Sequence, residues 1–298
     1  MGSASSQTTG FCECRDVVNK ILTADATDDC AMQMVAGTDE MEAKPFDDVC
    51  KAVKVTPTTV AAPPKKQKIQ ARPKVEDKDG GSYQGEWLGC WRHGKGIQVW
   101  SDGARYVGQW YHDVPHGQGR LEQGDVYDGQ WKNGKAHGRG VHVSTNHVRY
   151  EGEWRNDYKH GQGEEFYSDG GRYTGGWADG KKSGEGTFRW LDGSEFKGAF
   201  HDDLFHGQGK QRWADGRVYE GQWEANQMHG SGRFKWPDGR TYQGHYIQGL
   251  RHGQGKFKWT NGRVYEGEWQ LGKQHGQGAL TVEGQVTKGE WKSGVRVT

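Results

Sequence analysis

The chain has 298 residues, of which 32% are hydrophobic, and its 40 Lys/Arg and 39 Asp/Glu give a formal net charge of +1. This apolar share is below the roughly 45–50% of a usual globular protein, and the charge balance excludes a chain that binds polyanions as a whole. No apolar run reaches the roughly 18 residues of a membrane span. The five cysteines, four of them before residue 51, form no disulfide framework and indicate a reducing, intracellular compartment.

The first 79 residues differ from the rest and are predicted to form a flexible N-terminal region. Residues 1–50 hold ten Asp/Glu and three Lys/Arg, whereas residues 51–74 hold seven Lys/Arg and no acid. Apolar residues at helical spacing predict two short helices near 17–22 and 46–53, each too short to be stable alone. The basic, proline-containing stretch 61–74 is interpreted as a linker to a repeat array over residues 80–298.

From residue 83 onward, the motif Tyr-x-Gly-x-Trp recurs with a step of 23 residues in most repeats. A second motif, His-Gly-x-Gly, recurs in the same phase, and together they define nine full repeats and a partial one. The repeat aromatics expected to hold the array together are Tyr83, Trp87, Tyr106, Trp110, Tyr127, Trp131, Tyr150, Trp154, Tyr173, Trp177, Tyr219, Trp223, Tyr242, Tyr265 and Trp269.

Each repeat is predicted to be a β-hairpin. Alternation places Tyr83, Gly85 and Trp87 on one face of a short strand, and Asp-Gly or Asn-Gly dipeptides supply the positive φ of tight turns. A single hairpin is marginal in water, so the hairpins must stack on one another. Glycine in these strands leaves room for an aromatic ring from a neighbouring strand. The expected fold is all-β: an elongated, single-layer array of stacked antiparallel β-hairpins.

These two motifs resemble the MORN family (membrane occupation and recognition nexus). The resemblance covers residues 83–286 well and residues 287–298 in part. It implies a repeat scaffold with roles in membrane-proximal tethering, cytoskeletal organisation and dimerisation. It also implies contact with phospholipid and a homodimer formed through the C-terminal repeats.

Catalytic, metal and nucleotide sites are not expected in this pattern. The repeated histidines lie two strands apart, about 9–10 Å, whereas ligands of one metal lie at about 2 Å from it. Gly89–Gly96 resembles a phosphate-binding loop but has Gly96 where Ser or Thr should hold magnesium, and no helix follows. The acids recur at repeat positions that face solvent. The chain is therefore predicted to be non-catalytic, with no cofactor, no metal and no nucleic-acid partner.

The N-terminus carries a candidate membrane-targeting signal. Its first six residues fit the myristoylation pattern with Gly2 as acceptor, and Cys12 and Cys14 follow as candidates for palmitoylation. One myristoyl chain binds membranes only reversibly, so the cysteines would supply the second signal that stable anchoring needs. The alternative is an ordinary terminus without lipid.

Partner binding is expected on the array. The sixth repeat departs from the aromatic consensus with Phe196, Phe200, Leu204 and Phe205, which form a candidate partner patch or a local bend. The function predicted is a scaffold or adaptor, tethered by N-terminal acylation to the cytoplasmic face of a membrane or to the cortical cytoskeleton. The alternatives are a soluble protein-binding adaptor without an anchor, or an accessory protein of phosphoinositide signalling.

Overall fold

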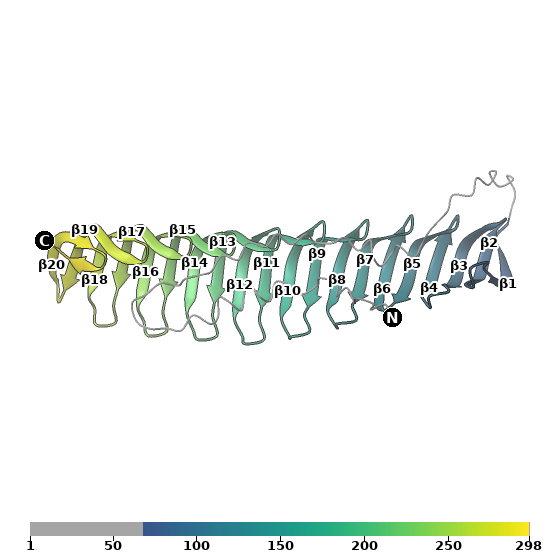
Figure 1. Ribbon diagram of the computed structural model, residues 1–298, viewed down its shortest axis with the longest axis horizontal. Coiled ribbons are helices and arrows are strands. Elements are labelled where there is room, and N and C mark those ends of the chain that lie inside the picture. The colour runs from purple at the N-terminus through teal and green to yellow at the C-terminus, as the bar shows by residue number, and fades with distance from the viewer. Residues whose placement is uncertain (1–67, 298) are drawn as a thin grey trace, which may run out of the picture. The chain divides into compact units, whose positions relative to one another are not determined.

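The computed structural model describes residues 68–297, which contain 21 β-strands and no helix (Figure 1). No helix in this range is long and apolar enough to cross a membrane. The described residues form two compact units, 68–184 and 185–297, called here the N-terminal and C-terminal units. The strand β11 (Lys181–Arg189) contains the division between them.

Ten strands precede the division and ten follow it. Those of the N-terminal unit are β1 (Gln70–Glu76), β2 (Ser82–Leu88), β3 (Trp91–Val99), β4 (Arg105–Tyr111), β5 (Val114–Gln123), β6 (Asp125–Lys132), β7 (Lys135–Val143), β8 (Arg149–Arg155), β9 (Tyr158–Phe166) and β10 (Arg172–Ala178). Those of the C-terminal unit are β12 (Glu195–His201), β13 (Leu204–Arg212), β14 (Val218–Glu224), β15 (Gln227–Lys235), β16 (Thr241–Ile247), β17 (Leu250–Lys258), β18 (Val264–Gln270), β19 (Lys273–Val282), β20 (Gln285–Lys292) and β21 (Val295–Arg296).

Within each unit, every strand pairs antiparallel with the next one in the chain, so the predicted all-β array of hairpins is confirmed. The turn at Asp102-Gly103 is closed by the N–H of Gly103, which donates to the carbonyl of Trp100. Gly103 has the positive φ, 87°, that the sequence predicted for these dipeptides. The turns at the other end of the hairpins use two successive residues with positive φ, such as Asn133 and Gly134, as a type I′ turn requires.

The motif tyrosine lies flat across the glycines of its own hairpin. Tyr219 is fully buried, and its hydroxyl donates to the carbonyl of Gln222 at 2.9 Å. A Cβ built on Gly232, in the facing strand, would lie 2.3 Å from the Tyr219 oxygen. The space left by the missing side chain is therefore filled by the ring, as the sequence suggested. The same arrangement repeats at Tyr106 over Gly119.

Tryptophan joins one repeat to the next. The Trp131 ring packs edge-on against Tyr127 of its own strand and against Tyr106 of the preceding repeat, with centroids 5.0 and 5.4 Å apart. Its indole N–H donates to the carbonyl of Gly119 at 2.9 Å. Edge-to-face pairs contribute about 0.5–1.5 kcal/mol each beyond their buried area. Trp110 and Trp154 likewise lie between two motif rings, as do Trp223, Tyr246 and Trp269 in the C-terminal unit, so the aromatic ladder is continuous within each unit.

The outer face, which is the side of the sheet opposite the buried motif rings, carries a second repeated contact. A β-bulge follows each His-Gly pair, where the glycine has positive φ, and the next backbone N–H needs an acceptor. In the seventh repeat, Gln222 supplies it by accepting from the N–H of Ser231 at 2.7 Å. Gln109 and Glu268 make the equivalent contact in their own repeats.

One strand lies where the sequence predicted a linker. Residues 70–76 form β1, which pairs with β2 and places Arg72 opposite Gly85. The Arg72 guanidinium lies 5.1 Å from the Trp87 ring, so β1 covers an aromatic edge that the first repeat would otherwise expose. The first strand of the described residues therefore lies before residue 80, partly within the stretch predicted to be a linker. The two predicted helices lie outside the described residues.

The close approach of tyrosine and glycine predicts the effect of one methyl group. Gly232→Ala should lower the free energy of unfolding by about 1–3 kcal/mol, because the new Cβ would overlap the Tyr219 ring. Ser231→Ala, at the exposed neighbouring position, is the matched control and should change stability by less than about 0.5 kcal/mol. Urea unfolding followed by tryptophan fluorescence measures both. Equal stability of the two variants would contradict this account of the glycine.

Candidate functional site

Two positions of each repeat reach the inner face without belonging to the aromatic motif. The first, called here the minus-one position, precedes the His-Gly pair; the second, called the plus-five position, is the fifth residue after that histidine. The minus-one residues are Arg92, Pro115, Ala136, Lys159, Lys182, Phe205, Met228, Arg251 and Gln274. The plus-five residues are Gln98, Leu121, His142, Glu165, Phe188, Gln211, Phe234, Phe257 and Leu280. In the N-terminal unit six of these nine residues are polar, and Gln98, His142, Glu165 and Lys182 among them are buried.

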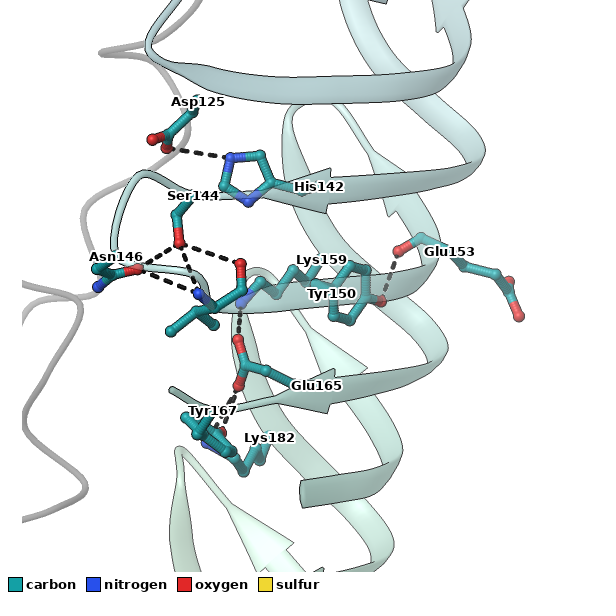
Figure 2. A network of polar contacts seen from close by, with 11 residues as sticks. Asp125, His142, Ser144, Asn146, Tyr150, Glu153, Lys159, Glu165, Tyr167 and Lys182 are labelled. Atoms are coloured by element: carbon teal, nitrogen blue, oxygen red, sulfur yellow. Dashed lines mark hydrogen bonds and ion pairs between the residues drawn. The ribbon is translucent and has the colours of Figure 1, made fainter. Parts of the chain in front are cut away.

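One deeply buried charge in that unit is Glu165. Its side chain is 5% exposed, and it lies on β9 between the motif tyrosines of β8 and β10, its strand partners on either side. Figure 2 shows its carboxylate facing Lys159, Lys182 and the hydroxyl of Tyr167. Lys159 and Tyr167 both donate to it, and the Lys182 ammonium lies 3.9 Å away. The cluster thus places two cations against one anion.

Aromatic rings hold the two lysines on the inner face. The Lys159 ammonium lies 4.8 Å from the centre of the Trp177 ring, and that of Lys182 lies 5.3 Å from the same ring. Cation–π contacts are strongest when they are desolvated, as here. Burial alone would raise the pKa of Glu165. The charges of Lys159 and Lys182, with the Tyr167 donor, lower that pKa below its ordinary value, so the carboxylate stays ionised.

His142 is the next polar group in the plus-five column. Its side chain is 5% exposed, and its Nε2 lies 3.2 Å from a carboxylate oxygen of Asp125. The other oxygen of Asp125 accepts the backbone N–H of Thr145 at 2.9 Å. Burial opposes ionisation of Asp125, but His142 and Thr145 together lower its pKa. Ser144 is engaged with Asn146 and the backbone of Val148, so its hydroxyl is committed to closing the turn (Figure 2).

The third polar centre lies at the first repeat. Arg92 donates to the side-chain oxygen of Gln98 at 2.8 Å, and its guanidinium lies 4.5 Å from the Trp110 ring. Gln98 in turn donates to Asp77, in the turn after β1, at 2.7 Å. This centre ties β1 to the first full repeat. All three centres therefore fix the geometry of the N-terminal unit through saturated polar contacts.

The structure places the residues singled out by the sequence as follows. Phe196, Phe200 and Phe205 of the candidate partner patch are buried, at 0%, 4% and 6% exposure, whereas Leu204 is 38% exposed. The three rings pack on one another, with Phe196 and Phe205 stacked at 3.7 Å, so they form core in place of the tyrosine motif. A partner patch there stays a prediction. Gly2, Cys12 and Cys14 lie outside the described residues.

Sequence reasoning missed the buried polar columns. Reading the repeats at the minus-one and plus-five positions would have revealed them, because Lys159, Lys182 and Glu165 occupy places that Met228 and Phe234 fill in the seventh repeat. The recurrent histidines do pack at the turns. His116, for example, lies 3.4 Å from the backbone nitrogen of Asn133. In the residues that the structure describes, no group of three or more potential metal ligands comes together.

Removing the central carboxylate takes away the anion that Lys159 and Lys182 share. Glu165→Phe is expected to lower the free energy of unfolding by about 3–5 kcal/mol, the usual cost of breaking a buried ion pair from one side. The triple variant Lys159→Met, Glu165→Phe, Lys182→Met copies the seventh repeat and should recover most of that loss. Amide hydrogen exchange of β9 and β10 measures both, since a repeat array can unfold in parts.

The loss of stability at acid pH should distinguish the wild type from the triple variant. Because the pKa of Glu165 is lowered in the folded protein, its contribution to stability is full above the ordinary glutamate value, about 4.3, and is lost as pH falls through the lowered value. The wild type should therefore lose more stability below about pH 4 than the triple variant. Identical acid profiles would contradict the proposed role of the carboxylate.

Comparisons with known proteins were consistent with this geometry. The MORN repeat family matches nine successive segments, at residues 83–105, 106–125, 127–149, 150–172, 173–195, 196–216, 219–239, 242–262 and 265–281. No curated protein matches the chain. Among solved structures, the SAS-4 (dCPAP) TCP domain of Drosophila melanogaster, in complex with a proline-rich motif of Ana2 (dSTIL), is 12% identical. That likeness covers 70% of this chain and 97% of that one, with a TM-score of 0.29.

The wild-type TCP10 domain of Danio rerio CPAP, in complex with a peptide of STIL, is 13% identical and covers 74% of this chain and 99% of its own, with a TM-score of 0.23. The family matches are of a different kind, since they extend over more than half of the chain and coincide with the hairpins described above. The chain belongs to the MORN repeat family.

Proposed function

We propose that this protein is a non-catalytic scaffold or adaptor, tethered to the cytoplasmic face of a membrane or to the cortical cytoskeleton, that holds protein partners on the outer face of its repeats. The motif rings cannot contact a partner, because Tyr106, Tyr150, Tyr219 and Tyr265 are all fully buried. Contact must therefore use side chains that differ from repeat to repeat.

The observation that carries the proposal is a change of chemistry on the outer face. In the N-terminal unit, this face presents half-buried valines, such as Val107, Val141 and Val143. In the C-terminal unit, the equivalent strands present exposed basic residues, including Lys235 and Lys258. The inner aromatic ladder stays constant across this change. A protein that keeps one framework while altering its surface is suited to bind different partners along its length.

The membrane-targeting signal is proposed to lie in the N-terminal region. Gly2 would accept a myristoyl chain and Cys12 and Cys14 would accept palmitoyl chains. Two lipid signals give stable anchoring where one does not. The exposed Lys68 and Lys74 of the described residues add positive charge close to that region, which favours an anionic membrane surface.

Gly2→Ala and the pair Cys12→Ser with Cys14→Ser test the anchor. Labelling of cells with an alkyne analogue of myristate should mark the wild type and not Gly2→Ala. Both variants should shift from the membrane pellet to the supernatant, because each keeps only one class of lipid signal or neither. Ser3→Ala is the matched control. Unchanged fractionation of both variants would favour an adaptor without a lipid anchor.

We also propose that two copies associate through the C-terminal edge. Within the described residues, β21 pairs with Trp291 and Lys292 of β20, and the N–H of Val297 and the side chain of Arg296 donate to the carbonyls of Glu290 and Lys288. No described strand pairs with residues 285–289 of β20 on the side away from β19. Val286 and Val295 are 60% and 66% exposed there. An unpaired strand edge with apolar side chains is a template for pairing with another chain.

Val286→Lys combined with Val295→Lys should therefore convert dimer to monomer, because charge on both edge strands opposes their pairing. Sedimentation velocity of the full chain over a range of concentrations provides the measurement. Leu191→Lys, at a residue 77% exposed in a different turn, is the control and should leave the distribution unchanged. A monomeric wild type would rule the dimer out.

A further inference from the structure

The outer face of the C-terminal unit carries a ladder of positive charge, defined here as Lys210, Arg212, Arg233, Lys235, Lys256 and Lys258. These residues occupy the same two positions on β13, β15 and β17. The intervening strands place Val218, Thr241 and Val264 directly opposite Arg212, Lys235 and Lys258. From Arg212 to Val264, one row of the ladder thus alternates a cation with an uncharged residue; on its other side Arg212 lies opposite Glu195, which pairs with Arg189.

Most of these charges are not neutralised within the unit. Lys210 and Lys256 pair with Glu220 and Glu266 at 2.6 and 2.9 Å. The other four basic residues make no ion pair within 4 Å to a described residue. Six cations against two carboxylates leave the ladder with a net charge of +4. Lys210 and then the nearby Arg212 and Arg233 lower the pKa of Glu220.

The ladder is local and not a property of every repeat. At the two corresponding positions, β3, β5, β7 and β9 carry only one basic residue, Arg120. The other seven residues there are Ile97, Val99, Glu122, Val141, Val143, Glu164 and Phe166. Nothing in the hairpin geometry therefore requires cations on this face, and their presence in three successive repeats points to a ligand.

The spacing of the ladder indicates the kind of ligand. Successive cations of one row lie two strands apart, about 9.5 Å, which is close to the Debye length of about 8 Å at physiological salt. A small anion would contact a single cation, whereas a flexible chain with several carboxylates can contact three. Glu220 and Glu266 stand among the cations and would oppose a uniformly charged membrane or nucleic-acid backbone. The geometry favours an acidic polypeptide.

The same chain contains such a segment. Residues 23–50 hold eight Asp/Glu and one Lys, grouped at 25–29, 39–42 and 47–48. The spacers between these groups have at least four residues, which span up to about 13 Å when extended and so can bridge neighbouring cations. We propose that residues 23–50 bind along the basic ladder of the same molecule and cover it until a more acidic segment of a partner displaces them. The proposal is independent of the lipid anchor.

Zero-length cross-linking of the full chain with a water-soluble carbodiimide tests this contact, because the reagent joins a carboxylate only to an amine that touches it. Peptide mapping by mass spectrometry should find Lys235, Lys256 or Lys258 joined to acids of residues 23–50. Arginine does not react, so Arg212→Gln with Arg233→Gln weakens the ladder without removing a reactive amine. The cross-link yield should fall about threefold or more, as expected for two exposed charge pairs.

Arg149→Gln with Arg172→Gln, on the outer face of the N-terminal unit, is the matched control and should leave the yield unchanged. Mixing unlabelled and ¹⁵N-labelled chains identifies the molecule that supplies the acid, and the cross-links should join peptides of one label. The proposal is overturned if no cross-link forms, if cross-links join only different copies, if they fall equally on Lys95 and Lys132, or if the arginine variant retains the wild-type yield.

Discussion

The structure depends on one contact, that of a tyrosine ring with the backbone of a glycine in the facing strand. Glycine normally weakens a strand because it adds conformational entropy and no packing. Here the ring occupies the place of the missing Cβ and donates its hydroxyl to a carbonyl of its own strand, as Tyr219 does above Gly232. The strand pair is thereby only one ring thick. A single layer can then bury its aromatics without a second sheet or a helix to cover them.

This constraint decides where variation is possible. The motif tyrosine, its glycines and the linking tryptophan are fixed by mutual contact, and the bulge on the outer face needs an acceptor such as Gln222. The remaining inner positions tolerate any side chain that finds partners in the next repeat. Glu165 is acceptable because Lys159 of the same strand and Lys182 of β11 reach it. Phe234 fills the same position where Met228 replaces the cation. Buried charge and buried hydrophobe are thus alternative solutions at one site of the repeat.

The repeat made much of this fold predictable. Alternation and the Asp-Gly turns fixed the hairpins, and the glycine contacts followed from the aromatic spacing. Features that do not follow the 23-residue repeat were not predicted from the sequence. The strand β1 has no motif and forms because it covers the Trp87 edge, a tertiary cause. The Glu165 cluster joins β9, the turn that follows it and β11, through residues that are not unusual within their own repeats. Phe196 and Phe205 break the consensus and suggested a partner patch or a local bend, and their mutual stacking, which the consensus does not contain, buries both rings.

The net charge of the whole chain likewise does not reveal how charge is distributed along it. A net charge of +1 suggests an electrostatically neutral protein. Acids are nevertheless concentrated before residue 51, and cations are concentrated on the outer face of the C-terminal unit. A repeat protein separates charge readily, because one substitution at an equivalent position in each of several repeats creates a row about 9.5 Å apart along the sheet. Such a row binds weakly at each step and strongly only to a chain that spans several steps. Specificity then depends on the spacing of acids along the ligand, which neither the repeat motif nor the net charge reveals.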